Sequence, residues 1–197
     1  MQKLSYIASQ GTERQLLEAL RRGDPASYRQ LYETHAPRLL RLLQRITRDE
    51  GLAHDALQCA FLIVFEKLDG FAGRSSLSTW MTQIGIREAQ RLVRQSTPRE
   101  LPAEPAPEPR RCPESESIHR EASVRLNSLI AALPVEKRAA LILFEVEGLT
   151  AREVAEVLDE PLGTVLARLS RTRAELRETM RDWAGLDEGL LGGGAHG

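Results

Sequence analysis

The sequence predicts an all-α protein: two small helical domains joined by an extended linker. Apolar residues recur at helical spacing through most of the 197 residues. Aromatic residues make up only 5% of the chain, which favours cores rich in leucine, alanine and valine over a β-sandwich. A stretch rich in proline and glutamate separates the two helical parts. The expected division is a disordered tail (1–11), a first domain (12–96), a linker (97–122), a second domain (123–182) and a flexible tail (183–197).

The first domain is expected to contain four helices. They are placed at residues 12–22, 24–47, 49–68 and 78–95. Pro37 lies inside the second of these, and a proline there should bend or split the helix. A loop with two glycines, 69–76, precedes the last helix. Trp80 follows soon after that loop, and we expect its ring to pack in the core.

The linker differs in composition from both domains. The stretch from Thr97 to Ile118 holds six of the ten prolines in the chain, together with five glutamates and almost no apolar residues. Such a segment cannot bury enough apolar surface to offset the entropy of ordering it. We therefore expect an extended, acidic connection between the domains.

The second domain ends in a predicted helix-turn-helix. Two helices, over 126–133 and 137–146, come first. Gly148 then ends one helix, and Thr150 opens the next with Glu153 placed to return the capping hydrogen bond. Asp159 occupies the turn, where aspartate tolerates a left-handed backbone. Pro161 suits the first turn of the final helix.

Basic residues are concentrated on that final helix. Residues 136–160 carry seven acidic side chains against three basic ones, whereas 163–181 carry five arginines against two glutamates. A helix-turn-helix protein presents its major-groove reader and phosphate contacts on its second helix. Because the formal net charge of the chain is only −1, any binding of nucleic acid must depend on such a local patch. A helix with a solvated arginine face is the alternative.

Other classes of function find little support in the sequence. The two cysteines and four histidines lack metal-ligand spacing, so we expect no metal and no cofactor. We find no motif of an enzyme active site. No apolar run is long enough to span a membrane and no signal peptide is recognisable, so a cytoplasmic protein is expected.

Both domains, in this order, resemble the bacterial extracytoplasmic-function sigma factors, which are promoter-specificity subunits of RNA polymerase. The resemblance runs from about Thr12 to Arg181. In the first domain it is carried by Asp55-Ala56-Leu57-Gln58 with Phe61, Lys67-Leu68, the loop 71–76 and Thr79-Trp80. In the second it is carried by Ala132-Leu133-Pro134, Glu147-Gly148-Leu149-Thr150, Glu153-Val154-Ala155, Pro161-Leu162-Gly163-Thr164-Val165 and Arg168-Leu169-Ser170-Arg171.

For the first domain, the resemblance implies two contact surfaces. The helix that carries Asp55, Gln58, Phe61 and Leu62 would lie against the clamp of core RNA polymerase. The loop before the next helix, with that helix itself, would meet the minus-ten promoter element through Ser75, Ser76 and Arg87. Backbone donors, small hydroxyls and nearby aromatic rings are suited to holding an unstacked base.

The second domain would read the minus-thirty-five element of promoter DNA. Arg168 and Arg171 are the candidates for base contacts, Arg173 and Arg177 for phosphate contacts, and Thr164 for a further DNA contact. Leu166 and Ala167 stand where the family commonly has polar or basic residues, which leaves apolar contact with thymine methyl groups. The resemblance further implies an anti-sigma partner and a role in stress response.

Departures from the family pattern at Ala72, Arg74, Gln83 and Ile86 keep two alternatives open. One is a sigma-like protein that acts through protein–protein contacts and binds DNA weakly or not at all. The other is an ordinary helix-turn-helix regulator with a helical sensing domain, which should be a dimer that binds palindromic sites. The second alternative leaves the Asp55 and Gln58 motif unexplained.

Overall fold

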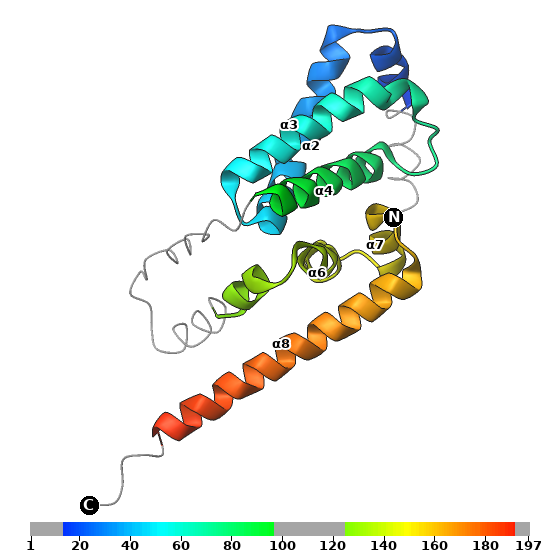
Figure 1. Ribbon diagram of the computed structural model, residues 1–197. Helices are drawn as coiled ribbons and strands as arrows, with labels where there is room; N and C mark the ends of the chain where they lie inside the picture. The colour runs from blue at the N-terminus through cyan, green and yellow to red at the C-terminus, as the bar shows by residue number, and fades with distance from the viewer. Residues whose placement is uncertain (1–13, 97–124, 192–197) are drawn as a thin grey trace, which may run out of the picture. The chain divides into compact units, whose positions relative to one another are not determined.

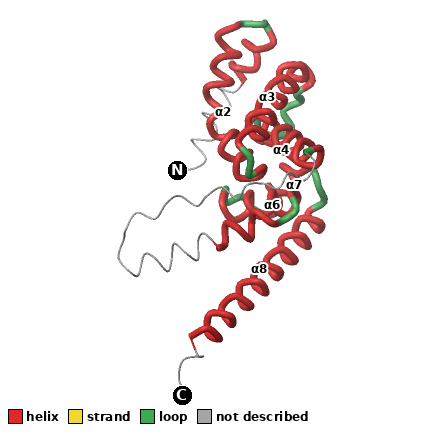
Figure 2. The backbone as a smooth tube through the Cα atoms, turned by 60° about the vertical axis from the view of Figure 1, so that its left-hand side comes forward, coloured by secondary structure: helices red, strands yellow, loops and turns green. Residues whose placement is uncertain are grey.

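The computed structural model describes residues 14–96 and 125–191, with side chains as far as Arg181. All secondary structure in these ranges is helical, and no strand occurs in them (Figures 1 and 2). The all-α prediction is therefore confirmed. The chain forms two compact units, built mainly on α2 to α4 and on α6 to α8. The predicted tail 1–11 and linker 97–122 lie outside the described residues.

The first unit begins with a helical segment, 14–21, and continues through three longer helices. These are α2 (Pro25–Thr47), α3 (Glu50–Lys67) and α4 (Leu77–Gln95), with a short 3₁₀ turn η1 (Leu68–Gly70) after α3. Each of the three starts at a side-chain cap, because the side chains of Asp24, Asp49 and Ser76 accept hydrogen bonds from backbone N–H groups of the first turn. The local capping signals thus fix where the helices begin.

Pro37 does not split α2, which runs from Pro25 to Thr47 as one helix. A proline inside a helix costs about 3 kcal/mol, chiefly through the lost hydrogen bond and the ring's clash with the preceding turn. Buried leucines on both sides of Pro37, among them Leu31 at 0% exposure and Leu43 at 0%, hold the two halves against α3 and α4. Their burial outweighs the local penalty.

The core of the first unit lies where α2, α3 and α4 meet. Its fully buried side chains include Leu31, Leu43, Ile46, Val64, Met81 and Ile86. A Cβ atom at Gly85 of α4 would lie 3.0 Å from Cδ1 of Leu39 in α2, so glycine permits the close approach of these two helices. Trp80 is half-buried with its ring centroid 5.0 Å from that of Phe71, so its predicted core position is reached only in part.

The second unit starts with a helical segment, 125–132, and then changes helix type. It contains α6 (Val135–Leu141), the π-helix η2 (Ile142–Val146), α7 (Ala151–Leu158) and α8 (Leu162–Leu191). Two buried side chains, Val154 and Val165, join α7 and α8 to a small core that also includes Leu143. The predicted helix over 137–146 is therefore α6 and η2 together.

The last helix is longer than expected. α8 continues to Leu191, although a flexible tail was predicted from residue 183. Half of the residues in the stretch 182–191 are alanine, leucine or glutamate, which are good helix formers, and Gly185 and Gly189 each cost only about 1 kcal/mol in a helix. The described residues contain no group of three or more His, Cys, Asp or Glu side chains placed to hold a metal ion. Among the same residues, no helix has the length and apolar character needed to cross a membrane.

Candidate nucleic-acid interface

The start of α7 and the turn between α7 and α8 both have the geometry that the sequence predicts. The Glu153 carboxylate accepts hydrogen bonds from the backbone N–H and the hydroxyl of Thr150, both at 2.8 Å, and the Glu153 N–H donates to Thr150 Oγ1 at 3.3 Å. These bonds hold the pKa of Glu153 below its usual value, with the backbone N–H as the larger cause. Asp159 has a φ of 54°, in the left-handed region. The capping box and the tight turn are both confirmed.

One side of α8 packs inward and the other is exposed. Val165 and Leu169 face the core at 0% and 3% exposure, and Thr172 is also fully buried. The opposite side carries exposed side chains at Leu166, Ser170, Arg171, Ala174, Arg177 and Arg181. Thr164 is exposed in the first turn of the helix. α8 therefore presents an outer face rich in arginine and in small side chains.

Two of the arginines predicted to bind DNA are held within the unit. Arg168 bonds to Glu160, with a closest N–O distance of 2.7 Å, and its side chain is only 18% exposed. Arg173 donates two hydrogen bonds to Glu145 Oε1, and its guanidinium lies 4.7 Å from the centre of the Phe144 ring. Both arginines brace α8, since their partners lie in the preceding turn and in η2.

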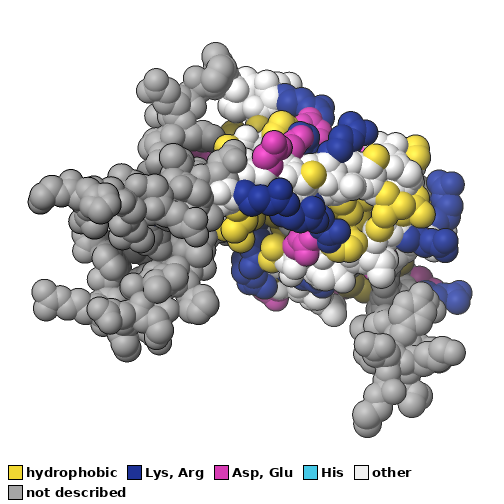
Figure 3. All heavy atoms as spheres, turned by 90° about the horizontal axis from the view of Figure 1, so that it is seen from below, with side chains coloured by type: hydrophobic (Ala, Val, Ile, Leu, Met, Phe, Trp, Pro, Cys, Tyr) yellow, Lys and Arg dark blue, Asp and Glu magenta, His cyan; other side chains and the backbone are white. Residues whose placement is uncertain are grey.

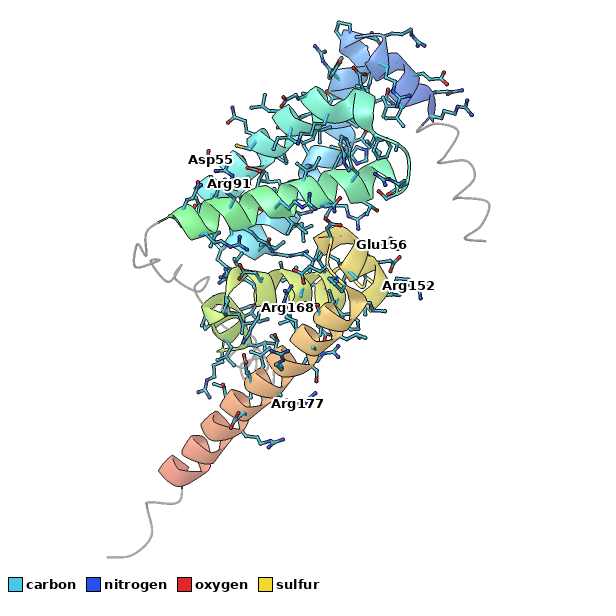
Figure 4. All side chains as sticks on the ribbon, turned by 45° about the vertical axis from the view of Figure 1, so that its right-hand side comes forward. Asp55, Arg91, Arg152, Glu156, Arg168 and Arg177 are labelled. Carbon is cyan, nitrogen blue, oxygen red and sulfur yellow. The ribbon has the colours of Figure 1, made fainter. Side chains whose placement is uncertain are left out.

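The other predicted arginines of α8 are available on its surface. Arg171 and Arg177 are exposed and form no ion pair with a described side chain, and Arg181 shares both properties. Figure 4 labels Arg168 and Arg177 on the same helix, and the two illustrate the difference: one is bonded back into the fold and the other is not. Among the described residues, the arginines of α8 that are exposed without an ion pair are thus Arg171, Arg177 and Arg181.

The first unit carries a second exposed surface on α3. Asp55, Gln58 and Leu62 recur at helical spacing and are all exposed, Leu62 to 62%; Asp55 is labelled in Figure 4. Phe61, which was predicted to belong with them, is 4% exposed and lies with its ring 4.8 Å from that of Tyr32. Phe61 is therefore not part of this exposed surface, because its side chain lies on the buried side of α3.

The loop before α4 is largely exposed, but one of its side chains already forms a hydrogen bond within the unit. The Ser76 hydroxyl caps α4 by accepting from the Thr79 N–H at 3.1 Å, whereas Ser75 is half-buried. Arg87 is exposed on α4. Further along, Arg91 bonds to Glu88 at 2.8 Å, and this hydrogen bond is the main reason that the pKa of Arg91 is raised. The loop can offer backbone groups and one hydroxyl to a ligand.

Charge of both signs is spread over the surface. In the space-filling view of Figure 3, lysine and arginine side chains lie among acidic and hydrophobic ones, and no uniform basic face is visible there. This mixture agrees with the formal net charge of −1. On that face, a polyanion would meet single basic side chains or short rows of them rather than a continuous basic patch.

Two family descriptions match the chain in the same order as its two units. Sigma-70 region 2 matches residues 31–99, and Sigma-70 region 4 matches residues 123–176. The chain belongs to the extracytoplasmic-function RNA polymerase sigma factors. As a sigma factor it binds core RNA polymerase and directs promoter-specific initiation of transcription. The resemblance that the sequence motifs indicated is confirmed.

Curated relatives match over most of the chain. The RNA polymerase sigma-H factor of Pseudomonas aeruginosa is 29% identical over 187 residues, which cover 89% of this chain and 97% of the relative. The extracytoplasmic-function RNA polymerase sigma-E factor of Escherichia coli is 28% identical over 179 residues, covering 85% and 93%. The sigma factor therefore spans nearly the full length of both relatives.

Solved structures agree on the fold. CnrH in complex with the cytosolic domain of CnrY matches with a TM-score of 0.61 at 22% identity, covering 86% of this chain and 97% of that one. The sigma factor RpoE, in complex with the anti-sigma factor NepR from Bartonella quintana, matches with a TM-score of 0.57 at 21% identity, covering 78% and 96%. At these identities the likeness concerns the fold alone.

Proposed function

We propose that the activity of this sigma factor is divided among three surfaces, of which the outer face of α8 reads the minus-thirty-five element. The observation that carries this assignment is the exposure of Arg171 and Arg177 on the side of α8 opposite its buried Val165 and Leu169. An arginine that bonds guanine through two hydrogen bonds discriminates by about 1–3 kcal/mol. Arg171 lies nearer the start of α8, so we assign it the base contact. Arg177 we assign to phosphate, together with Thr164.

Arg168 and Arg173 have a different role in this proposal. Each is bonded to a carboxylate of its own unit, Glu160 or Glu145. A contact of either arginine with DNA would have to replace that ion pair. We therefore propose that both act mainly by positioning α8, which changes the role predicted for them from the sequence.

The surface of Asp55, Gln58 and Leu62 on α3 is proposed to bind core polymerase. An exposed leucine beside polar side chains that can hydrogen-bond is typical of a contact surface for another protein. The loop before α4 is proposed to hold the minus-ten element, with Ser75, Ser76 and Arg87 as its contacts. This is the part of the proposal that depends most on the resemblance; its structural support is the exposure of Ser76, whose hydroxyl also caps α4.

A regulatory partner follows from the solved relatives. Their titles describe sigma factors bound to CnrY or to the anti-sigma factor NepR. We propose that an anti-sigma factor likewise binds this chain and competes with core polymerase for the α3 surface. In this proposal the chain works in the cytoplasm, where RNA polymerase is, and takes part in initiation without catalysing a reaction of its own.

Transcription in vitro tests the division of roles. Purified sigma factor with core polymerase should give transcripts from a specific promoter. Arg171→Ala should lower initiation that depends on the minus-thirty-five element about tenfold while binding to core polymerase is unchanged. Asp55→Ala with Gln58→Ala should weaken binding to core polymerase itself, measured separately by fluorescence anisotropy of labelled sigma factor.

Two results would contradict the proposal. If transcripts start equally well on any DNA, or core polymerase does not bind, the alternative of a sigma-like protein that acts only on other proteins is correct. If Arg168→Ala reduces promoter selectivity more than Arg171→Ala at equal folded fraction, the base contact belongs to the ion-paired arginine instead. Circular dichroism melting gives the folded fraction for each variant.

A further inference from the structure

Two leucines in the first turns of α8 leave much of their side chains exposed to solvent. Leu166 is 50% exposed and Leu162, one turn earlier, is 38% exposed, whereas Val165 between them is fully buried. These two side chains lie on the part of α8 that is proposed to enter the major groove, where the exposed half of Leu166 offers apolar surface to a base.

The surroundings of Leu166 suit close approach to a nucleic acid. Ser170 and Ala174 follow it on the outer face and are small and exposed, so no bulky side chain keeps the helix backbone away from a partner. The stretch 162–174 contains no acidic residue and three arginines, of which Arg168 and Arg173 are paired with carboxylates outside it and Arg171 is not. Arg171 and Arg177 add positive charge further along the same helix. This charge pattern complements a groove lined by phosphates and favours DNA over another protein as the partner of this surface.

We propose that Leu166 reads the 5-methyl group of a thymine in the minus-thirty-five element, near a guanine read by Arg171. In the major groove, thymine is the base that offers a methyl group for apolar contact. A leucine placed against cytosine would instead cover its amino group, which would lose its hydrogen bond to water without gaining another. Leu166 therefore favours thymine and penalises cytosine at one position. This inference rests on the proposed reading of DNA by α8.

The helix geometry limits where the two bases lie. Leu166 and Arg171 are five residues apart, which is about 7.5 Å along the axis of an α-helix at about 1.5 Å per residue. Successive base pairs are separated by about 3.4 Å. If the axis of α8 follows the groove, the thymine and the guanine lie about two base-pair steps apart; the two side chains leave the helix about 140° apart, so the bases can belong to different strands.

A promoter selection followed by replacement of single thymines with uracil tests the proposal. The full sigma factor with core polymerase is used to select active promoters from a library randomised across the minus-thirty-five region. The best promoter is then synthesised with uracil in place of each selected thymine in turn. Uracil pairs as thymine does but lacks the methyl group. At one position the change should lower initiation about threefold to fivefold, the value of one buried methyl group.

The variants assign this effect to one side chain. With Leu166→Ala, the same uracil promoter and its thymine parent should be used equally well. Met180→Ala is the matched control, since Met180 is 43% exposed on α8, about 21 Å further along its axis. This variant should keep the full response to uracil. Initiation by Leu166→Ala on a promoter with cytosine at that position should fall less than it does for the wild type.

Each remaining outcome is decisive. If the wild-type protein initiates selectively but responds to no uracil, or if Leu166→Ala keeps the wild-type response, the thymine contact is wrong and promoter reading by α8 stands. If Leu166→Ala loses binding to core polymerase instead, the surface belongs to a protein contact. If the wild type gives no promoter-specific transcript, the proposed reading of DNA fails, and the inference fails with it.

Discussion

The two units of the molecule are stabilised in different ways. In the first, large side chains such as Leu43, Ile46 and Met81 are buried between three long helices. In the second, the core is smaller, and ion pairs join its helices and turns: Arg168 with Glu160, Arg173 with Glu145 and Lys137 with Glu175, which are 8, 28 and 38 positions apart.

This difference changes how the charge of α8 should be interpreted. Five arginines on the helix indicate a strong electrostatic attraction to DNA when they are counted in the sequence. Two of them, Arg168 and Arg173, already neutralise carboxylates that hold the helix in place. The charge free to meet phosphates is therefore smaller, and the salt dependence of DNA binding should reflect fewer contacts than the sequence suggests.

The largest effect is expected in the core of the first unit. Leu43→Ala removes a side chain with 0% exposure and should lower the free energy of unfolding by about 2–5 kcal/mol, because it leaves a cavity among α2, α3 and α4. Urea unfolding with hydrogen exchange resolved by segment would locate the loss in these helices. Leu62→Ala, at a side chain 62% exposed, is the control and should cost about 0.5 kcal/mol or less. Equal losses in the two variants would contradict the description of this core.

Much of the fold could be predicted because its signals are local. The start of α2 follows from Asp24 with Pro25, and that of α7 follows from Thr150 with Glu153; the structure contains both sets of hydrogen bonds. The bounds of α3 and α4 lie within one residue of those predicted. Capping depends on residues two or three positions apart, so one sequence is enough to recognise it.

Other features could not be predicted, because they depend on tertiary contacts. The π-helix η2 has no local signature in the sequence, and a bond from the Glu147 N–H to the Ile142 carbonyl at 3.0 Å closes its wider turn. The partner of Arg173 lies 28 positions away, at Glu145. The spacing of apolar residues predicts a buried and an exposed face for α8, but it does not indicate which arginines bond to the protein's own carboxylates.

A smaller effect is expected when the bracing pair in the second unit is removed. A double-mutant cycle with Arg173→Gln and Glu145→Gln should give a coupling free energy of about 0.5–1 kcal/mol, because the pair is partly exposed, at 37% and 46%. The coupling should fall as salt is raised from 50 mM to 500 mM, measured by urea unfolding at both concentrations. Arg171→Gln paired with Glu145→Gln is the control and should show no coupling. If no coupling is measured at low salt, Glu145 does not hold Arg173, and this arginine is available to contact DNA.

The smallest expected effect is the pH dependence of the capping box at the start of α7. The pKa of Glu153 is lowered from 4.5 because its carboxylate accepts hydrogen bonds from Thr150. The carboxylate is charged when it stabilises the fold, so its contribution is complete above about pH 4.5 and is lost as the pH falls through the lower pKa of the folded state. Because Glu153 is exposed, water screens the effect.

Thermal melting between pH 7 and pH 3 measures this contribution. Relative to the wild type, Glu153→Gln should melt at a lower temperature at pH 7, and the difference should shrink toward pH 3, because both proteins then carry a neutral side chain at this position. Glu156→Gln, at an exposed carboxylate one turn further along α7, is the control and should show no such convergence. A difference between wild type and Glu153→Gln that stays constant over this range would mean that the charge of Glu153 plays no part in the cap. If the two proteins instead melt at the same temperature at every pH, the hydrogen-bonding groups that glutamate and glutamine share suffice to start the helix that precedes α8.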